Sequence, residues 1–266
     1  MKLQVLMATM NVKTEATLPA GIDELIKNKV KCTLINQCSS QNDHLFVNQN
    51  KLSVFSFFEK GLSKSRNRNL KLLTETIGLI SDQDIHFKKG FQETIISAYK
   101  QYPDADIITF QIEDEDGKLL KNYRKEAFWM NQRDIMKVSS VEITCKAASI
   151  RNNHLIFDED FGLGAVFPTG EEAIFLSDAL KKGLKILYLP LPIVIHPRDS
   201  SGYQFSNNKS LIRAKGAMFY RMFGFSAYPI SIIFAIKKFK MSSQSLLSFA
   251  KNMFEGISSY KKLRND

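Results

Sequence analysis

The segment Gly61-Leu62-Ser63-Lys64-Ser65-Arg66-Asn67, followed by Asp82-Gln83-Asp84, decides the expected fold of this chain. The first segment is a basic loop that opens a helix, and the second follows an apolar strand over 77–81. In open α/β sheets, ligands lie outside the carboxyl ends of the strands. Because Mg²⁺ at phosphates is usually held by one or two protein carboxylates, the pattern favours a metal-bound phosphate ligand. The alternative is a surface turn rich in aspartate.

Strand-like and helix-like stretches alternate along the first 200 residues, which predicts a mostly parallel sheet with helices on both faces. Around residue 200 the pattern becomes helical, so we expect one α/β domain over 1–200 and a C-terminal extension over 201–266. The expected strands are 3–10, 31–36, 51–58, 77–81, 106–113, 141–149, 186–188 and 190–195, and the expected helices are 21–30, 61–76, 90–101, 171–183, 210–224, 227–239 and 242–262.

The net charge of +10 is concentrated in the C-terminal extension. Residues 1–200 hold 26 Lys or Arg against 25 Asp or Glu, whereas residues 201–266 hold 11 against 2. Basic tails bind nucleic acid, anionic lipid or acidic partners. Because these charges are interspersed with Phe, Met and Ile, lipid suits the tail better than nucleic acid. The apolar stripe of 242–262 fits either a membrane interface or packing onto the α/β domain over 1–200.

The remaining composition narrows the class of protein. Cys32, Cys38 and Cys145 have no C-x-x-C spacing, so we expect reduced thiols in a cytosolic protein, without structural zinc. No segment reaches the roughly 18 uninterrupted apolar residues of a spanning helix, so none is expected.

Three motifs, in this order, carry a resemblance to a known family: Lys60–Asn67, Ser81–Asp84, and Phe161–Gly164 leading to Gly170–Leu176. Over residues 3–200 the chain resembles a family 2 glycosyltransferase of GT-A fold, similar to those of bacterial capsule and exopolysaccharide synthesis. The resemblance implies a Rossmann-like, mostly parallel central sheet with helices on both faces, followed here by a C-terminal helical segment.

The resemblance also implies a nucleotide-sugar donor, with a UDP-sugar as the first candidate, and Mn²⁺ or Mg²⁺ as cofactor. The group transferred is a hexosyl or N-acetylhexosaminyl unit, with inversion at the anomeric carbon. One departure is that the second strand ends in Asn36-Gln37, where relatives carry an aspartate pair. The implied donor-binding residues are Thr9, Asn11, Gln37, Arg66, Asn67 and Asp82, and the implied metal ligands are Asp84 and His196.

On the acceptor side, the family's catalytic base falls on Glu172, with Glu171 contacting the acceptor or orienting the base. Inverting transfer needs a base that takes the proton of the attacking hydroxyl. The structural alternative is an acidic pair stabilised by the dipole of the helix it begins. Phe161 is expected to stack on an acceptor sugar, and Gly162 and Gly164 to let the backbone approach it.

The Gln-x-x-Arg-Trp element of processive synthases is absent, which implies addition of a single sugar. The implied acceptor is a saccharide, lipid-linked, in surface polysaccharide biosynthesis, and the implied location is the cytoplasm, peripheral on the inner face of the bacterial membrane. Two alternatives stay open. A sugar-nucleotide-forming nucleotidyltransferase would share the sheet, but 8–12 lacks its glycine-rich loop. A non-catalytic sugar- or nucleic-acid-binding module would need the basic tail alone.

Overall fold

The computed structural model describes residues 1–19, 21–40, 45–49, 51–197 and 207–265 of the 266-residue chain. They form two compact units, each with its own core. The domain boundary expected at residue 200 lies outside the described residues and stays a prediction. Unit 1 contains Met1–Lys60, Lys64–Ile156 and 175–197, and unit 2 contains Gly61–Ser63, Phe157–Ile174 and 207–265.

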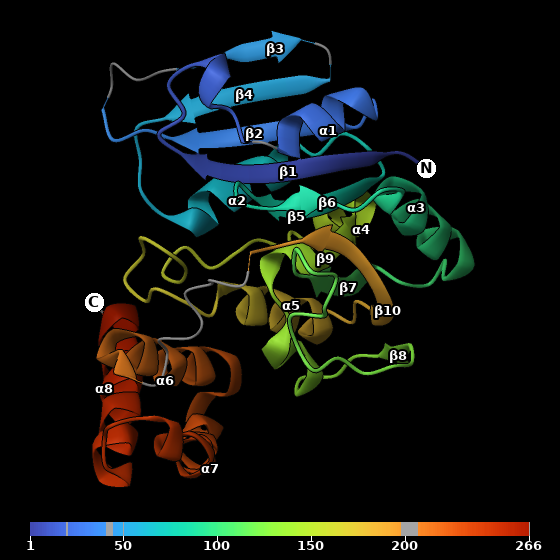
Figure 1. The fold of residues 1–266 in the computed structure, drawn as a ribbon. Coiled ribbons are helices and arrows are strands. Elements are labelled where there is room, and N and C mark those ends of the chain that lie inside the picture. The colour runs from blue at the N-terminus through green and yellow to red at the C-terminus, as the bar shows by residue number, and fades with distance from the viewer. Residues whose placement is uncertain (20, 41–44, 50, 198–206, 266) are drawn as a thin grey trace. The chain divides into compact units, whose positions relative to one another are not determined.

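Unit 1 is built on a ten-stranded sheet of order β3-β4-β2-β1-β5-β9-β7-β10-β6, with β8 beside β10 (Figure 1). The long strands pair with one another in parallel, as expected, and the antiparallel strands are the short ones, including β9, which lies between β5 and β7. The parallel strands are β1 (Leu3–Met10), β2 (Lys31–Gln37), β4 (Leu52–Phe57), β5 (Ile77–Asp82), β7 (Ile107–Glu113) and β10 (Ile186–Ile195); the antiparallel strands are β3 (Val47–Gln49), β6 (His86–Phe87), β8 (Phe128–Trp129) and β9 (Ile143–Lys146).

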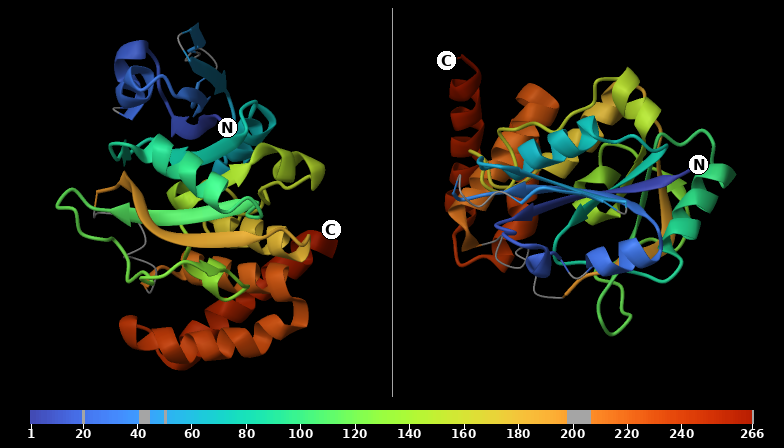
Figure 2. Two further views of the ribbon diagram at one scale, coloured as in Figure 1. Left: turned by 90° about the vertical axis from the view of Figure 1, so that its right-hand side faces the viewer. Right: turned by 90° about the horizontal axis from the view of Figure 1, so that it is seen from above.

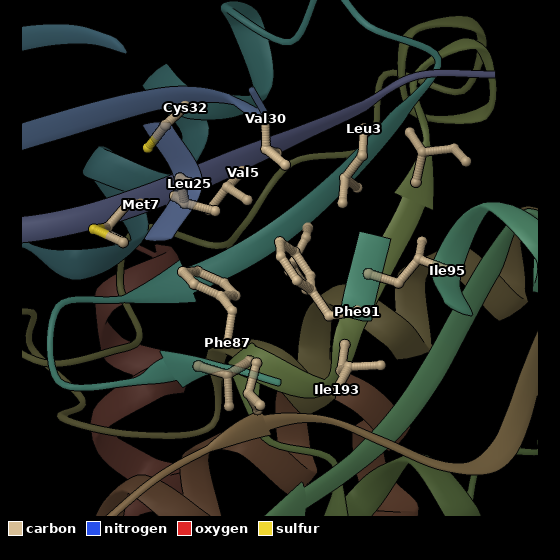
Figure 3. Packing of buried hydrophobic residues seen from close by; sticks show 14 of the residues in the cluster. Leu3, Val5, Met7, Leu25, Val30, Cys32, Phe87, Phe91, Ile95 and Ile193 are labelled. Carbon is tan, nitrogen blue, oxygen red and sulfur yellow. The ribbon is translucent and has the colours of Figure 1, made fainter. Parts of the chain in front are cut away.

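Helices cover both faces of this sheet (Figure 2). On one face, α1 (Gly21–Lys27) and α3 (Phe91–Gln101) pack on the alternate β1 side chains Leu3, Val5 and Met7 (Figure 3). On the other face, α2 (Leu62–Lys71) is tied to β1 through Asn69, whose amide donates to the Met7 carbonyl at 2.9 Å. The helix α4 (Ala147–Asn152) and the short turns η1 (Glu15–Thr17), η2 (Asp134–Lys137) and η3 (Ser140–Glu142) complete the unit; α5 (Glu171–Lys181) begins in unit 2 and continues into unit 1.

The expected α/β class is confirmed, but the strand expected over 141–149 is mostly wrong. Only Ile143–Lys146 are extended, and they run antiparallel between β5 and β7. Ser139 and Glu142 form a capping box that turns the chain before the strand. After it, two alanines begin α4, because alanine favours helix over strand.

Unit 2 contains three helices and two short turns over residues 207–265. The apolar stripe predicted in 242–262 is buried inside this unit, where α8 packs on α6. The stripe thus packs on another helix of the C-terminal segment, whereas the expected alternatives were the α/β domain and a membrane; membrane contact by this segment stays a prediction. The elements are α6 (Lys209–Phe223), η5 (Gly224–Ser226), α7 (Ala227–Lys238), η6 (Phe239–Met241) and α8 (Leu246–Asn265), and the buried stripe comprises Phe249, Met253, Ile257 and Tyr260.

One stretch, Lys209–Met241, is long and apolar enough to cross a membrane by length and composition alone. Counting uninterrupted apolar runs did not reveal it. In the structure the stretch is not one straight helix, because Gly224, with φ of 57°, ends α6 before α7 begins.

Gly216→Ala should destabilise unit 2, because an added Cβ would lie 2.0 Å from the Met253 carbonyl oxygen of α8. Alanine gains about 1 kcal/mol of helix propensity over glycine, so a net loss isolates this clash. We expect the free energy of unfolding to fall by about 1–3 kcal/mol in urea titration. The control Ser258→Ala, on the exposed side of α8, should be neutral or mildly stabilising. A Gly216→Ala protein as stable as the parent would contradict the close α6–α8 contact.

Candidate functional site

The parallel register of β1 with β2 and β5 gathers the predicted donor residues at one edge of the unit 1 sheet. Met10 pairs with Gln37, and Ala8 pairs with Asp82. Thr9 and Asn11 therefore lie at the same carboxyl edge as Gln37 and Asp82, although up to 73 positions separate them in sequence. This is the edge at which open α/β sheets bind ligands.

Thr9 and Asn11 both shape this edge. The Thr9 hydroxyl donates to the side-chain oxygen of Gln83, which also accepts from the Met10 amide at 3.3 Å. Asn11 has a left-handed φ of 58°, and its side-chain oxygen accepts from the Ser39 amide at 2.9 Å. The β1 end is thus tied to the β5 loop on one side and to the β2 loop on the other.

The two amides that stand where relatives carry an aspartate pair are both buried. Asn36 is fully buried and bonds both backbone groups of Val12, at 3.0 and 2.7 Å. It is a structural residue. Gln37 is also buried, and its backbone carbonyl accepts a hydrogen bond from the backbone amide of Asn11 at 2.8 Å. Asn67 is buried on α2.

An ion pair with a buried arginine holds Asp82, whose own side chain is 29% exposed. The Arg66 guanidinium, 2% exposed, lies 3.3 Å from Oδ1 of Asp82, and the Ser140 hydroxyl donates to Oδ2 at 2.7 Å. Both carboxylate oxygens therefore have partners without any ligand. Arg66 fixes the orientation of Asp82, and the Arg66 contact with a pyrophosphate stays a prediction.

The two predicted metal ligands lie together. Nε2 of His196 is 3.6 Å from Oδ2 of Asp84, and the Asp84 side chain is 58% exposed. His196 directly follows β10, and its backbone amide donates to the Glu113 carbonyl at 2.9 Å. Strand pairing thus brings together two residues separated by 112 positions.

The donor set fits a divalent cation. Nδ1 of His196 lies 2.6 Å from the Pro197 carbonyl oxygen; with its proton on Nδ1 the ring makes that bond, and Nε2 would then be the nitrogen that binds a metal beside Asp84. A cation is the favourable occupant between a lone pair and a carboxylate. Within the described ranges, no group of three or more His, Cys, Asp or Glu could hold a metal.

In unit 2 the glycine loop and the acidic helix start are packed together. A Cβ on Gly162, whose φ is 108°, would lie 3.2 Å from the Glu171 carboxyl carbon and 3.0 Å from the Ser63 hydroxyl. The Ser63 hydroxyl donates to the Phe161 carbonyl at 2.6 Å. Gly164, with φ of 82°, lets the loop turn. These glycines admit a buried carboxylate beside the loop.

Phe161 does not present a free ring. It is fully buried and stacks on Phe167, with ring centroids 4.9 Å apart, and it also contacts Tyr260. This packing assigns Phe161 to the core of the loop, not to stacking on an acceptor sugar. Asp158 before it is held by ion pairs as well, since Arg221 and Arg264 lie 2.7 and 3.3 Å from its carboxylate.

Glu171 is buried and Glu172 is half-buried in the first turn of α5. Lys215 of α6 is a third charged group near them. Burial lowers the pKa of the Lys215 ammonium, while the charges of Glu172 and Glu171 oppose that shift and the charge of Lys238 adds to it. Lys215 thus balances the acidic pair electrostatically. Glu171 and Glu172 belong to unit 2 and the strand-edge residues to unit 1, so their action on one ligand stays a prediction.

Three of the residues that shape these groups escaped sequence reasoning: Gln83, Ser140 and Lys215. Gln83 could have been suspected from its place between two aspartates. The Ser139-to-Glu142 capping box signals a turn, but nothing in the sequence aims Ser140 at Asp82. Lys215 is one of many basic residues in the tail. Burial raises the pKa of Cys32 and Cys145 to about 12, so neither thiol is suited to nucleophilic chemistry.

The chain has the GT-A glycosyltransferase fold, with a mostly parallel sheet, flanking helices and a C-terminal helical segment. Crystal structures of S. aureus TarS share this fold. One has a TM-score of 0.61 and 17% identity, covering 91% of this chain and 44% of TarS. TarS 1–349 in complex with UDP-GlcNAc gives 0.60 and 17%, covering 91% and 74%.

The complex of TarS 1–349 with UDP also gives a TM-score of 0.60 and 17% identity, covering 90% of this chain and 72% of that one. At this identity the likeness establishes the fold alone. The present chain spans less than half the length of the longer TarS chain. No family model and no curated protein matches this sequence.

Asp82→Asn should destabilise unit 1, because the Arg66 guanidinium is nearly inaccessible to water and would lose a carboxylate partner. We expect the free energy of unfolding to fall by about 2–3 kcal/mol in urea titration. Asp104→Asn is the matched control, since its pair with Lys185 is exposed on both sides, at 72% and 59%. The control should change stability by about 0.5 kcal/mol or less. Equal effects of the two substitutions would show that Asp82 is not held by a pair with a buried arginine.

Proposed function

We propose that this chain is a family 2 glycosyltransferase that moves one sugar, with inversion, from a nucleotide-sugar donor to a saccharide acceptor. The observation that carries the proposal is the placement of Asp82, Asp84 and His196 at the carboxyl edge of a GT-A sheet. Strands β5 and β10 bring the pair Asp84–His196 together, and that pair has the chemistry of a small divalent-metal site.

A UDP-sugar is the proposed donor, because structures of the same fold from S. aureus TarS hold UDP and UDP-GlcNAc. Thr9, Asn11 and Gln37 border the proposed nucleoside site at the ends of β1 and β2. Asp82, held by Arg66, would accept hydrogen bonds from the nucleoside. The transferred group is proposed to be hexosyl or N-acetylhexosaminyl.

Mn²⁺ or Mg²⁺ is the proposed cofactor, with Asp84 and His196 as its protein ligands. When bound, the cation neutralises the charge that develops on the departing diphosphate. Two protein ligands make a weak site by themselves, and phosphate oxygens of the donor would complete the coordination. Metal affinity should therefore depend on the donor.

Glu172 is the proposed base. It would take the proton from the acceptor hydroxyl while that oxygen attacks the anomeric carbon and the bond to the diphosphate breaks. Glu171, buried against Gly162, would orient this turn of α5. Lys215 would keep the pair of carboxylates compatible with each other by supplying a nearby positive charge.

The proposed acceptor is a lipid-linked saccharide in surface polysaccharide biosynthesis, such as capsule, and the proposed location is the cytoplasmic membrane face. The basic C-terminal segment supports this, since an anionic membrane attracts a net excess of lysine and arginine. A nucleotidyltransferase remains the second candidate by fold class alone, and no contact among the described residues favours it.

Glu172→Gln should reduce transfer about 10²- to 10⁴-fold while donor binding is retained, because the amide keeps the shape and loses the base. The assay measures release of nucleoside diphosphate and product from the UDP-, GDP- or dTDP-sugar that most stabilises the chain thermally, with Mn²⁺ and with EDTA. Glu93→Gln is the control, an exposed acid in the first turn of α3. Parent-like turnover by Glu172→Gln would remove Glu172 as base. If none of these donors stabilises the chain thermally, the proposed function is refuted.

A further inference from the structure

Helix α7 buries small side chains and exposes three isoleucines, which is the reverse of the usual arrangement in a water-soluble protein. Its buried residues are small and recur every fourth position, at Ala227, Ser231 and Ala235. Three of its large apolar side chains face outward, since Ile232 is 47% exposed, Ile233 54% and Ile236 53%, whereas Phe234 packs on Phe219 and Phe249. A surface helix normally turns its apolar stripe toward the core. The outward set Ile232, Ile233 and Ile236 is called the isoleucine face below.

The isoleucine face is not needed to hold unit 2 together. The core of the unit lies between α6 and α8, where Gly216 and Gly256 let the helix backbones approach closely. Only 28% of the most apolar window in Lys209–Met241 is buried. Contiguous apolar surface of this kind marks an interaction site.

Exposed lysines lie at the end of α7 and in the turn η6 that follows it. Lys237 and Lys240 are exposed and follow Ile233 and Ile236 at a spacing of four. Between residues 200 and 254 the sequence contains eight Lys or Arg and no Asp or Glu. An apolar face bordered by lysines, in a stretch of sequence without Asp or Glu, matches the boundary between acyl chains and anionic headgroups.

The helix is too short to span. With 12 residues, α7 is about 18 Å long, whereas the hydrocarbon core of a bilayer is about 30 Å thick. Since Gly224 ends α6 before α7 begins, the two helices do not join into one straight span. The geometry therefore suits a helix that lies in the interface plane.

We propose that α7 is the membrane-docking element of this protein, with the isoleucine face inserted among lipids and Lys237 and Lys240 on anionic headgroups. A second copy of the chain suits the face less well, because symmetric pairing would bring like charges together. The inference rests on the proposed function, because the membrane that α7 binds would be the one that carries the lipid-linked acceptor. It replaces the 242–262 stripe, which is buried.

The test is flotation of the full chain with vesicles of phosphatidylcholine alone or with 30% phosphatidylglycerol. The parent should bind the anionic vesicles and release them at high salt. Ile232→Ser, Ile233→Ser and Ile236→Ser combined should weaken binding at least about tenfold. Lys237→Gln and Lys240→Gln should each weaken it about fivefold, on anionic vesicles only. Ile26→Ser, 41% exposed on α1, is the matched control and should bind as the parent does.

Parent-like binding by the triple isoleucine variant, or no parent binding to anionic vesicles, would overturn the inference. So would a parent dimer in light scattering that the isoleucine substitutions dissociate without any loss of vesicle affinity. Circular dichroism and donor-induced thermal stabilisation of each variant check the fold. Donor stabilisation is measured in solution, without vesicles. A parent chain that no donor stabilises would therefore refute the glycosyltransferase proposal, whereas a parent chain that is stabilised but does not float with vesicles would refute only the docking proposal.

Discussion

Parallel hydrogen bonding between β1 and its neighbours β2 and β5 is the constraint on which the candidate donor site depends. Because all three strands end at one edge, three loops distant in sequence meet there. A shift of β5 by one residue would turn Asp82 to the opposite face of the sheet. The bonds from Thr9 to Gln83 and from Arg66 to Asp82 hold the loops that follow.

The sequence predicted this edge well because apolar strands and their polar ends leave a local signature. It placed Thr9, Asn11, Asp82 and Asp84 by strand ends, and the structure brings His196 to within 3.6 Å of Asp84; that the two residues share a metal ion stays a prediction. What escaped prediction depends on contacts between distant segments. Ser140 reaches Asp82 only because η3 lies at the start of the short strand β9, and the fully buried ring of Phe161 could not be distinguished from an exposed one by its glycine neighbours.

The C-terminal segment shows the same limit. The apolar periodicity of α8 was recognisable, but periodicity cannot tell which partner covers a stripe. In the structure that stripe packs on α6. On α7, the small residues Ala227, Ser231 and Ala235 are buried, and the isoleucine face is exposed. Charge and exposed apolar surface therefore coincide on α7, and not on α8, whose apolar stripe the sequence had singled out.

The central claim is that a nucleotide-sugar binds at the carboxyl edge of β1, β2 and β5. Hydrogen–deuterium exchange of the full chain tests it most directly, with and without a saturating nucleoside diphosphate and Mn²⁺. The account predicts slower exchange of backbone amides at 9–12, 37–39 and 82–86, with α7 unchanged. Protection confined to the basic C-terminal helices, with this edge unaffected, would contradict it.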